Sequence, residues 1–104
     1  MENYKALLSL RAHKDMLEIV THITQDLQQP EAALKTVTDI AEGIASLSDM
    51  PKRFARVADR RPARKGIRKL KVGNYLVFFM IDEPNQIVHI LGVLYERRDW
   101  RNIL

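Results

Sequence analysis

Two apolar runs in the second half of the chain limit its fold more than any other feature of the sequence. Tyr75–Ile81 and Ile87–Tyr95 are apolar at nearly every position, and residues 82–85, which include a proline, separate them. Runs that are apolar on both faces are typical of strands covered on both sides of a sheet, and the short turn between them predicts an antiparallel pair. We therefore expect a β-sheet with these two strands in its interior.

A third strand is predicted directly before this pair. In residues 67–72 the side chains alternate, with Arg68, Leu70 and Val72 on one face and Ile67, Lys69 and Lys71 on the other. Gly73 and Asn74 follow, and both tolerate the positive φ that a two-residue hairpin turn of the primed type requires. The three strands should form an antiparallel meander.

The N-terminal half indicates one strand and two helices. Its first residues alternate with a period of two and predict a short strand, whose buried face would carry Tyr4, Ala6, Leu8 and Leu10. From about Ala12 the period becomes helical for roughly four turns, with an apolar stripe of Met16, Val20, Ile23 and Leu27. A second helix begins at Pro30, which suits a first helical position. That helix ends near residues 48–51, and its apolar face holds Ala33, Val37, Ile40, Ile44 and Leu47.

This order, β-α-α-β-β-β, predicts an α+β fold in which an antiparallel sheet has a helical hairpin packed on one face. Residues 1–104 have the length of one domain, and we expect a single one. The sequence has no cysteine, which excludes disulfides and thiolate metal sites, and its longest apolar run is too short to cross a bilayer. We therefore expect a cytoplasmic protein that is not bound to a membrane and uses no metal and no cofactor.

Charge is distributed unevenly between the two halves. Residues 1–50 hold four bases and eight acids, a net charge of −4, whereas residues 51–104 hold thirteen bases and five acids, a net charge of +8, and together these give the chain's +4. A concentrated basic surface attracts anions over roughly a Debye length. The C-terminal half is therefore expected to meet an acidic or phosphate-bearing partner.

The basic residues are densest between residues 52 and 75, which contain ten of the seventeen Lys and Arg residues and a single acid. Residues 52–65 show no sustained period and contain Pro62, so we expect a loop, with a short edge strand near Phe54–Val57. The cations of this segment that we expect to bind an anionic target are Arg64, Lys65 and Arg68.

Lys69 and Lys71 are candidates for catalysis at a nucleic-acid phosphate, because they lie about 7 Å apart on one face of a strand. Arg97 and Arg98 follow the last strand and would bring a second cationic pair near the first. Such a cluster can position phosphates and stabilise charge that develops at one of them. The alternative is a solvated face or ion pairs with acids such as Glu96, since surface pairs are common.

Three aromatic residues lie nearest to these cations and are candidates for stacking on bases: Tyr75, Tyr95 and Trp100. For Tyr75 a place in the core is the better interpretation. For Tyr95 and Trp100, which stand beside arginines at the end of the sheet, both interpretations stay open.

The segments IRKLKVGNYLVFFMID and VHILGVLYERRDW, preceded by a helix that starts PEAA and ends LSDMP, are similar to the RelE/ParE superfamily of toxins from bacterial type II toxin–antitoxin systems. The similarity covers almost the whole chain. It implies a small cytosolic toxin that a cognate antitoxin silences in a hetero-oligomer. RelE-like members cleave mRNA on the ribosome without a metal, using the concave face of the sheet, whereas ParE-like members inhibit DNA gyrase. Both share this fold, so the fold does not choose between them.

The resemblance can be carried to individual positions. The ribonucleolytic members usually have an arginine directly after the tyrosine that opens the central strand, and here Leu76 follows Tyr75. A guanidinium is the group that best contacts a scissile phosphate through two hydrogen bonds, so its absence favours the ParE-like activity. A cleavage reaction, with a 2′-hydroxyl as nucleophile, would have to use Lys69, Lys71, Tyr95 and Arg97 or Arg98.

We therefore expect a toxin that acts on DNA gyrase or another protein target. One alternative is a metal-independent endoribonuclease that cuts ribosome-bound mRNA, and another is a non-toxic homologue that persists as a binding module. In each case the expected partner is an antitoxin whose acidic or amphipathic C-terminal segment covers the sheet and its basic face, adding a helix or a strand.

Overall fold

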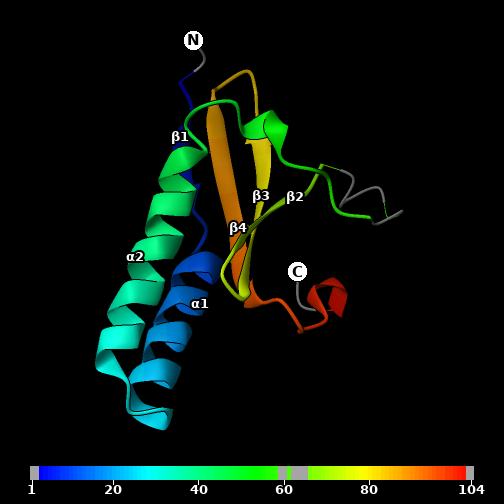
Figure 1. The fold of residues 1–104 in the computed structure, drawn as a ribbon. Coiled ribbons are helices and arrows are strands. Elements are labelled where there is room, and N and C mark those ends of the chain that lie inside the picture. Colours follow the sequence, from blue (N-terminus) through cyan, green and yellow to red (C-terminus); the bar gives the residue numbers. More distant parts are fainter. Residues whose placement is uncertain (1–2, 59–60, 62–65, 103–104) are drawn as a thin grey trace.

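Four strands form one sheet in the computed structural model, which describes residues 3–58, 61 and 66–102. The strands are β1 (Lys5–Leu8), β2 (Arg68–Val72), β3 (Tyr75–Asp82) and β4 (Ile87–Tyr95), and their order across the sheet is β1-β4-β3-β2. The two apolar runs are β3 and β4, and both lie in the interior of the sheet, as the sequence predicts. Figure 1 shows that the helices cover one face of this sheet.

The α+β fold and its element order are confirmed, but the sheet is mixed and not wholly antiparallel. β2, β3 and β4 form the expected antiparallel meander, whereas β1 pairs with β4 in parallel, with Lys5 opposite Ile87 and Leu8 opposite Ile90. The reason is the connection. The helical hairpin between β1 and β2 is a crossover that returns the chain to the end of the sheet where β1 started, so β2 runs in the same direction as β1. Two further hairpin reversals then make β4 parallel to β1 as well.

The β2–β3 turn needs positive φ at only one of its two central residues. Gly73 has φ +58°, whereas the φ of Asn74 is not positive. Positive φ at the first central position alone is the pattern of a type II′ turn, which has glycine at that position. The expected edge strand near Phe54–Val57 is reduced to a single bridge, between Arg56 and Arg68.

Helix α1 (Leu10–Thr21) begins earlier than the sequence pattern predicts. Ser9 caps it, because its hydroxyl oxygen accepts a hydrogen bond from the amide of Ala12 (3.0 Å). The cap ends β1 at Leu8, so Leu10 lies on the helix with 84% of its surface exposed, and its expected place on the buried face of the strand was wrong. The five-residue π-helix His22–Asp26 continues α1 and completes the predicted length.

Helix α2 (Pro30–Ser46) begins at the predicted proline, with Glu31 in its first turn, where a negative charge is favourable. At its other end Arg53 donates hydrogen bonds to the carbonyl oxygens of Ser46, Asp49 and Met50, so its charge lies at the negative end of the helix. In the described part of the chain no helix is long and apolar enough to cross a membrane.

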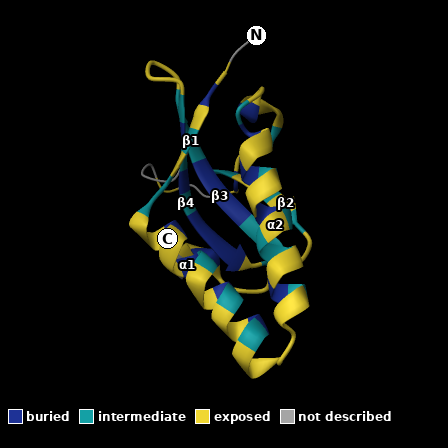
Figure 2. Cartoon of the chain, turned by 90° about the vertical axis from the view of Figure 1, so that its left-hand side faces the viewer, coloured by how far each residue is buried: buried dark blue, intermediate teal, exposed yellow. Residues whose placement is uncertain are grey.

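The sheet has an apolar cluster on each face. Between the sheet and the helices lies the larger core, which includes Ile40, Val77, Phe79, Val88 and Ile90. On the other face a smaller cluster forms, made of Val57, Ile67, Phe78, Leu94 and Trp100. The two central strands, β3 and β4, are therefore largely dark in Figure 2, where the outer surfaces of both helices are exposed. This double cover explains why β3 and β4 are apolar on both faces.

Candidate functional site

Lys69 and Lys71 lie on the face of the sheet that points away from the helices. Both are exposed, while their neighbours Leu70 and Val72 pack against the helical core on the other face. Lys71 forms an ion pair with Glu96 (3.0 Å), whereas Lys69 has no ion-pair partner among the residues that the structure describes. One lysine of the predicted pair is therefore partly neutralised, and one is available to an anion.

Arg68, expected to bind the target, has a structural role in this arrangement. Its guanidinium donates hydrogen bonds to the carbonyl oxygens of Phe54 (2.7 Å) and Lys52 (3.2 Å). It belongs to the opposite face of β2 from Lys69, so it does not join the exposed lysines. The two remaining loop cations, Arg64 and Lys65, lie outside the described residues.

Trp100 is buried, with 9% of its surface exposed, and its ring packs on Phe78 at 5.2 Å between centroids. It belongs to the short 3₁₀-helix Trp100–Asn102, and Arg101 covers its ring (5.0 Å) and donates a hydrogen bond to the carbonyl oxygen of Ala58. In this position Trp100 closes part of the sheet face and presents no free ring face to a base. Leu76 and Met80 pack against the same cluster.

A groove of about 660 Å³ lies where the two helices extend past the end of the sheet. We call it the hairpin groove. From the helices it is lined by Asp15, Glu18, Ile19, His22, Ile23, Leu27, Ala32 and Thr36, and from the sheet end by Asn74, Tyr75, Val93, Leu94, Tyr95 and Arg98. Of the sequence candidates that the structure describes, Tyr75, Tyr95 and Arg98 line it.

The wall at the sheet end is aromatic and carries a cation at its rim. Tyr75 and Tyr95 stand opposite each other in neighbouring strands, with ring centroids 5.8 Å apart in an edge-to-face arrangement. Burial, and then the neighbouring Tyr95, raise the pKa of Tyr75 above its ordinary value of 10.0, so its hydroxyl stays neutral. Arg98 is exposed at the rim, and neither Arg97 nor Arg98 has an ion-pair partner in the described part of the chain.

The helical wall of the groove was missed by the sequence interpretation, although a signal for it exists. The apolar stripe of the first helix continues to Ile23 and Leu27, and Leu27 keeps 52% of its surface exposed. Residues 10–26 form a helical run of about 25 Å at 1.5 Å per residue. In Figure 1 the two helices extend past the end of the sheet, so the last part of that stripe has no strand beneath it.

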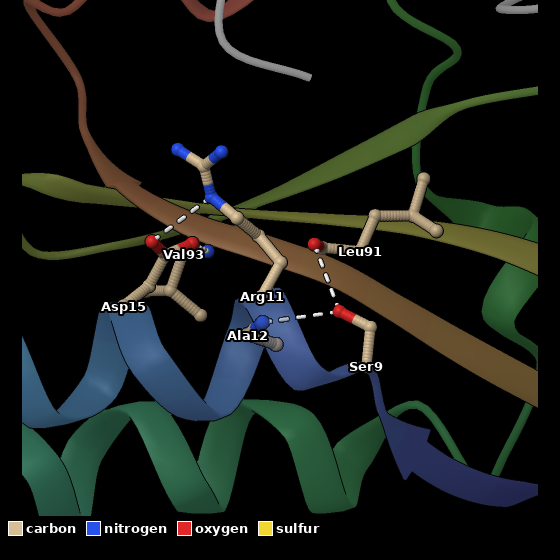
Figure 3. Close-up of polar contacts among 6 residues, drawn as sticks. All are labelled: Ser9, Arg11, Ala12, Asp15, Leu91 and Val93. Carbon is tan, nitrogen blue, oxygen red and sulfur yellow. Dashed lines mark hydrogen bonds and ion pairs between the residues drawn. The ribbon is translucent and has the colours of Figure 1, made fainter.

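Polar side chains at the start of α1 hold β4 beside this groove (Figure 3). The Ser9 hydroxyl donates to the carbonyl oxygen of Leu91 (3.0 Å), and the amide of Val93 donates to the carboxylate of Asp15 (2.9 Å). Arg11 donates to the other Asp15 oxygen (3.3 Å). We call this set of bonds the β4 brace.

The family model for the ParE toxin of the parDE type II toxin–antitoxin system matches residues 6–100. The chain belongs to the ParE toxin family. It is a ParE-type toxin of a type II toxin–antitoxin system, as the resemblance predicts. No curated protein sequence matches the chain.

Similar solved structures share the fold. A chain of the chromosomal ParDE toxin–antitoxin system from P. aeruginosa matches with a TM-score of 0.73 and 24% identity over 91% of this chain and 98% of that one. A chain of the RelBE2 toxin–antitoxin complex from Mycobacterium tuberculosis matches with 0.62 and 23% over 91% and 93%. A chain of the archaeal RelE–RelB complex from Pyrococcus horikoshii OT3 matches with 0.60 and 14% over 92% and 98%.

Proposed function

We propose that this ParE-family toxin arrests growth by binding DNA gyrase, and that it does not cut mRNA. The observation that carries the proposal is the environment of Leu76. It lies between Lys71 of β2 and Leu94 of β4 in the strand register and packs against the apolar cluster under Trp100. The position where a nuclease of the superfamily would carry a guanidinium is therefore apolar, and the Leu76 side chain cannot form hydrogen bonds to a phosphate.

The neighbouring candidates also support binding over cleavage. Lys71 is paired with Glu96, Arg68 is bonded to backbone carbonyls, and Trp100 is buried. The cations left without ion-pair partners within the described residues, Lys69, Arg97 and Arg98, offer charge to an acidic protein surface without an assembled acid–base pair.

Two assays with the purified toxin separate the activities. We expect gyrase supercoiling to stall in its presence, while mRNA in a translation extract stays intact. Site-specific mRNA cuts that Lys69→Ala abolishes would refute the proposal and establish the endoribonuclease instead. Normal growth of a bacterium that expresses the toxin well, without its antitoxin, would favour a non-toxic binding module.

We further propose that a cognate antitoxin neutralises this toxin by occupying the hairpin groove in a hetero-oligomer, and not by covering the basic face of the sheet as the sequence predicts. The groove combines apolar side chains such as Ile23 and Leu27 with two tyrosines and the rim cation Arg98. This suits a segment with one apolar face and an acidic residue near its end. The three similar structures come from toxin–antitoxin systems, which supports such a partner.

The probe for this test is the cognate antitoxin, which we expect a short reading frame beside the toxin gene to encode. Leu27→Ala should weaken its binding at least about tenfold, as expected for an apolar contact residue in a groove. Leu17→Ala is the matched control, because Leu17 is also an exposed leucine, lies in the helical run that Leu27 directly follows, and does not line the groove. Equal affinities of the two variants would place the antitoxin elsewhere.

A further inference from the structure

We propose that Asp15 is a positioning residue for the hairpin groove. Its buried carboxylate holds the amide of Val93 and thereby fixes the last residues of β4, which present Tyr95 and Arg98 to the partner. This inference rests on the proposed function, because the partner is the antitoxin placed in the groove.

On one side, β4 loses its neighbouring strand halfway along its length. β1 ends at Leu8, opposite Ile90, while β4 continues to Tyr95. The strand register also shifts at this point: Phe78 pairs with Gly92 and Phe79 with Ile90, so Leu91 is an extra residue in β4. Such a bulge bends its strand and leaves local backbone groups without strand partners. The rest of β4 needs another support on its open side.

The start of α1 supplies that support (Figure 3). The Ser9 amide donates to the carbonyl oxygen of Ile90 (2.9 Å), the Ser9 hydroxyl to that of Leu91 (3.0 Å), and the Val93 amide to Asp15 (2.9 Å). These bonds continue along β4 in the order in which a strand would pair with it. Asp15 makes the bond that lies furthest along the strand and nearest to the groove, which it also lines.

The Asp15 carboxylate makes a stronger hydrogen bond to the Val93 amide than a neutral side chain would. Asp15 is the buried charged residue of the described chain, with 5% of its surface exposed, and a charge-assisted bond to a backbone amide is short and strong. Burying a carboxylate costs free energy, and apolar replacements of buried ion pairs are often as stable. Stability alone therefore does not explain an acid here, whereas control over the path of β4 does.

The path of β4 determines where the groove residues stand. Tyr95 follows Val93 by two residues, so the two point to the same side of the strand. The carbonyl oxygen of Tyr95 accepts a hydrogen bond from the amide of Arg98 (3.0 Å), and the Tyr95 ring contacts the ring of Tyr75. A shift at Val93 would displace the aromatic pair and the rim arginine together.

The test compares Asp15→Ala with Asp15→Asn and Ser9→Ala, using antitoxin binding measured well below the unfolding temperature of each variant. Asp15→Ala should weaken binding at least about tenfold and speed amide hydrogen exchange at Val93 and Tyr95. Asp15→Asn keeps an oxygen acceptor but loses the charge, so it should weaken binding by about threefold, between wild type and Asp15→Ala. Ser9→Ala removes the helix cap and the Leu91 bond, so it should lower the unfolding temperature and weaken binding less than Asp15→Ala does, because its bond to β4 lies further from the groove. Wild-type affinity in folded Asp15→Ala, or an equal loss in Ser9→Ala, would overturn the inference.

One further variant, together with the Leu27→Ala result, keeps the outcomes separate. If Asp15→Ala does not fold, Asp15→Glu replaces it, because the charge is kept while the longer side chain moves the carboxylate off the amide. The same loss of affinity is then expected, and wild-type affinity would refute the positioning role. Failure of the proposed function has a different signature: Leu27→Ala binds the antitoxin as tightly as wild type, and the Asp15 variants still change amide exchange at Tyr95.

Discussion

Replacing Gly43 by alanine sets two effects of opposite sign against each other. Gly43 lies inside α2, where alanine is favoured over glycine by about 1 kcal/mol. A Cβ at this position would stand 2.8 Å from Cγ2 of Val72 and 3.3 Å from Cδ2 of Leu70, both on β2. Excess volume in a packed site costs about 1–3 kcal/mol, and the branched valine has little rotamer freedom with which to move aside. We expect a net loss of about 1 kcal/mol in the free energy of unfolding.

A double-mutant cycle isolates the steric effect. Val72→Ala removes the methyl group that the new Cβ would meet, so Gly43→Ala should stabilise that background by about 1 kcal/mol. The coupling between the two positions is then about 2 kcal/mol, within the range for residues in contact. Urea unfolding of the wild type, both single variants and the double variant measures it. Ala41→Gly, at an exposed position of the same helix, calibrates the propensity effect.

The sign of the change in the free energy of unfolding tests whether the steric effect outweighs helix propensity at Gly43. If Gly43→Ala raises the free energy of unfolding equally in both backgrounds, α2 does not approach β2 as closely as these distances require. If Ala41→Gly has no effect, helix propensity is not the favourable contribution.

Three further predictions concern other parts of the molecule. Trp100→Ala should lower the free energy of unfolding by about 3 kcal/mol, since the ring is buried on Phe78. A loss below about 1 kcal/mol in urea unfolding would show that the ring does not belong to the smaller apolar cluster, on the sheet face away from the helices. The Asn85 amide, with His89 contributing less, holds the pKa of Asp82 below its ordinary value of 3.8, so this carboxylate adds stability above that pH and loses it as the pH falls through the lower, folded-state pKa. The difference in unfolding temperature between wild type and Asp82→Asn should therefore be present at neutral pH and disappear as the pH falls through the folded-state pKa of Asp82, and a difference that stays constant with pH would contradict it. Met50 has φ +49° and an exposed side chain, so Met50→Gly should change the free energy of unfolding by between zero and about +1 kcal/mol, and a clear loss in urea unfolding would show that the methionine packs.

The order and type of the elements could be predicted because they depend on local pattern. The two-sided apolar runs became β3 and β4, and Pro30 marked the start of α2. Leu10 was placed wrongly because its apolar character fits the strand period, while the start of the helix depends on one hydrogen bond from the Ala12 amide to Ser9. The alternation of apolar residues along a strand does not show where a helix cap ends that strand, because the cap depends on a local side-chain hydrogen bond.

The candidate site was predicted less well than the fold, for a physical reason. Lys69 was placed on the correct exposed face, because alternation along a strand fixes faces. The partners of the charged residues could not be read in the same way. The pairing of Lys71 with Glu96 and the bonds of Arg68 to the backbone depend on which segments the fold brings together.

By itself the sequence determined the α+β class, the antiparallel meander, the basic C-terminal half and the resemblance to a toxin superfamily, since these follow from periodicity, turn residues and counted charge. Only the tertiary structure decided that β1 lies parallel to β4, that Trp100 covers part of one face of the sheet, and that a groove lies where the helices extend past the end of the sheet. It also gave Asp15 its place on the amide of Val93, 78 residues away in the chain. Contacts at such separations arise from the packing of whole elements, and no local pattern records them.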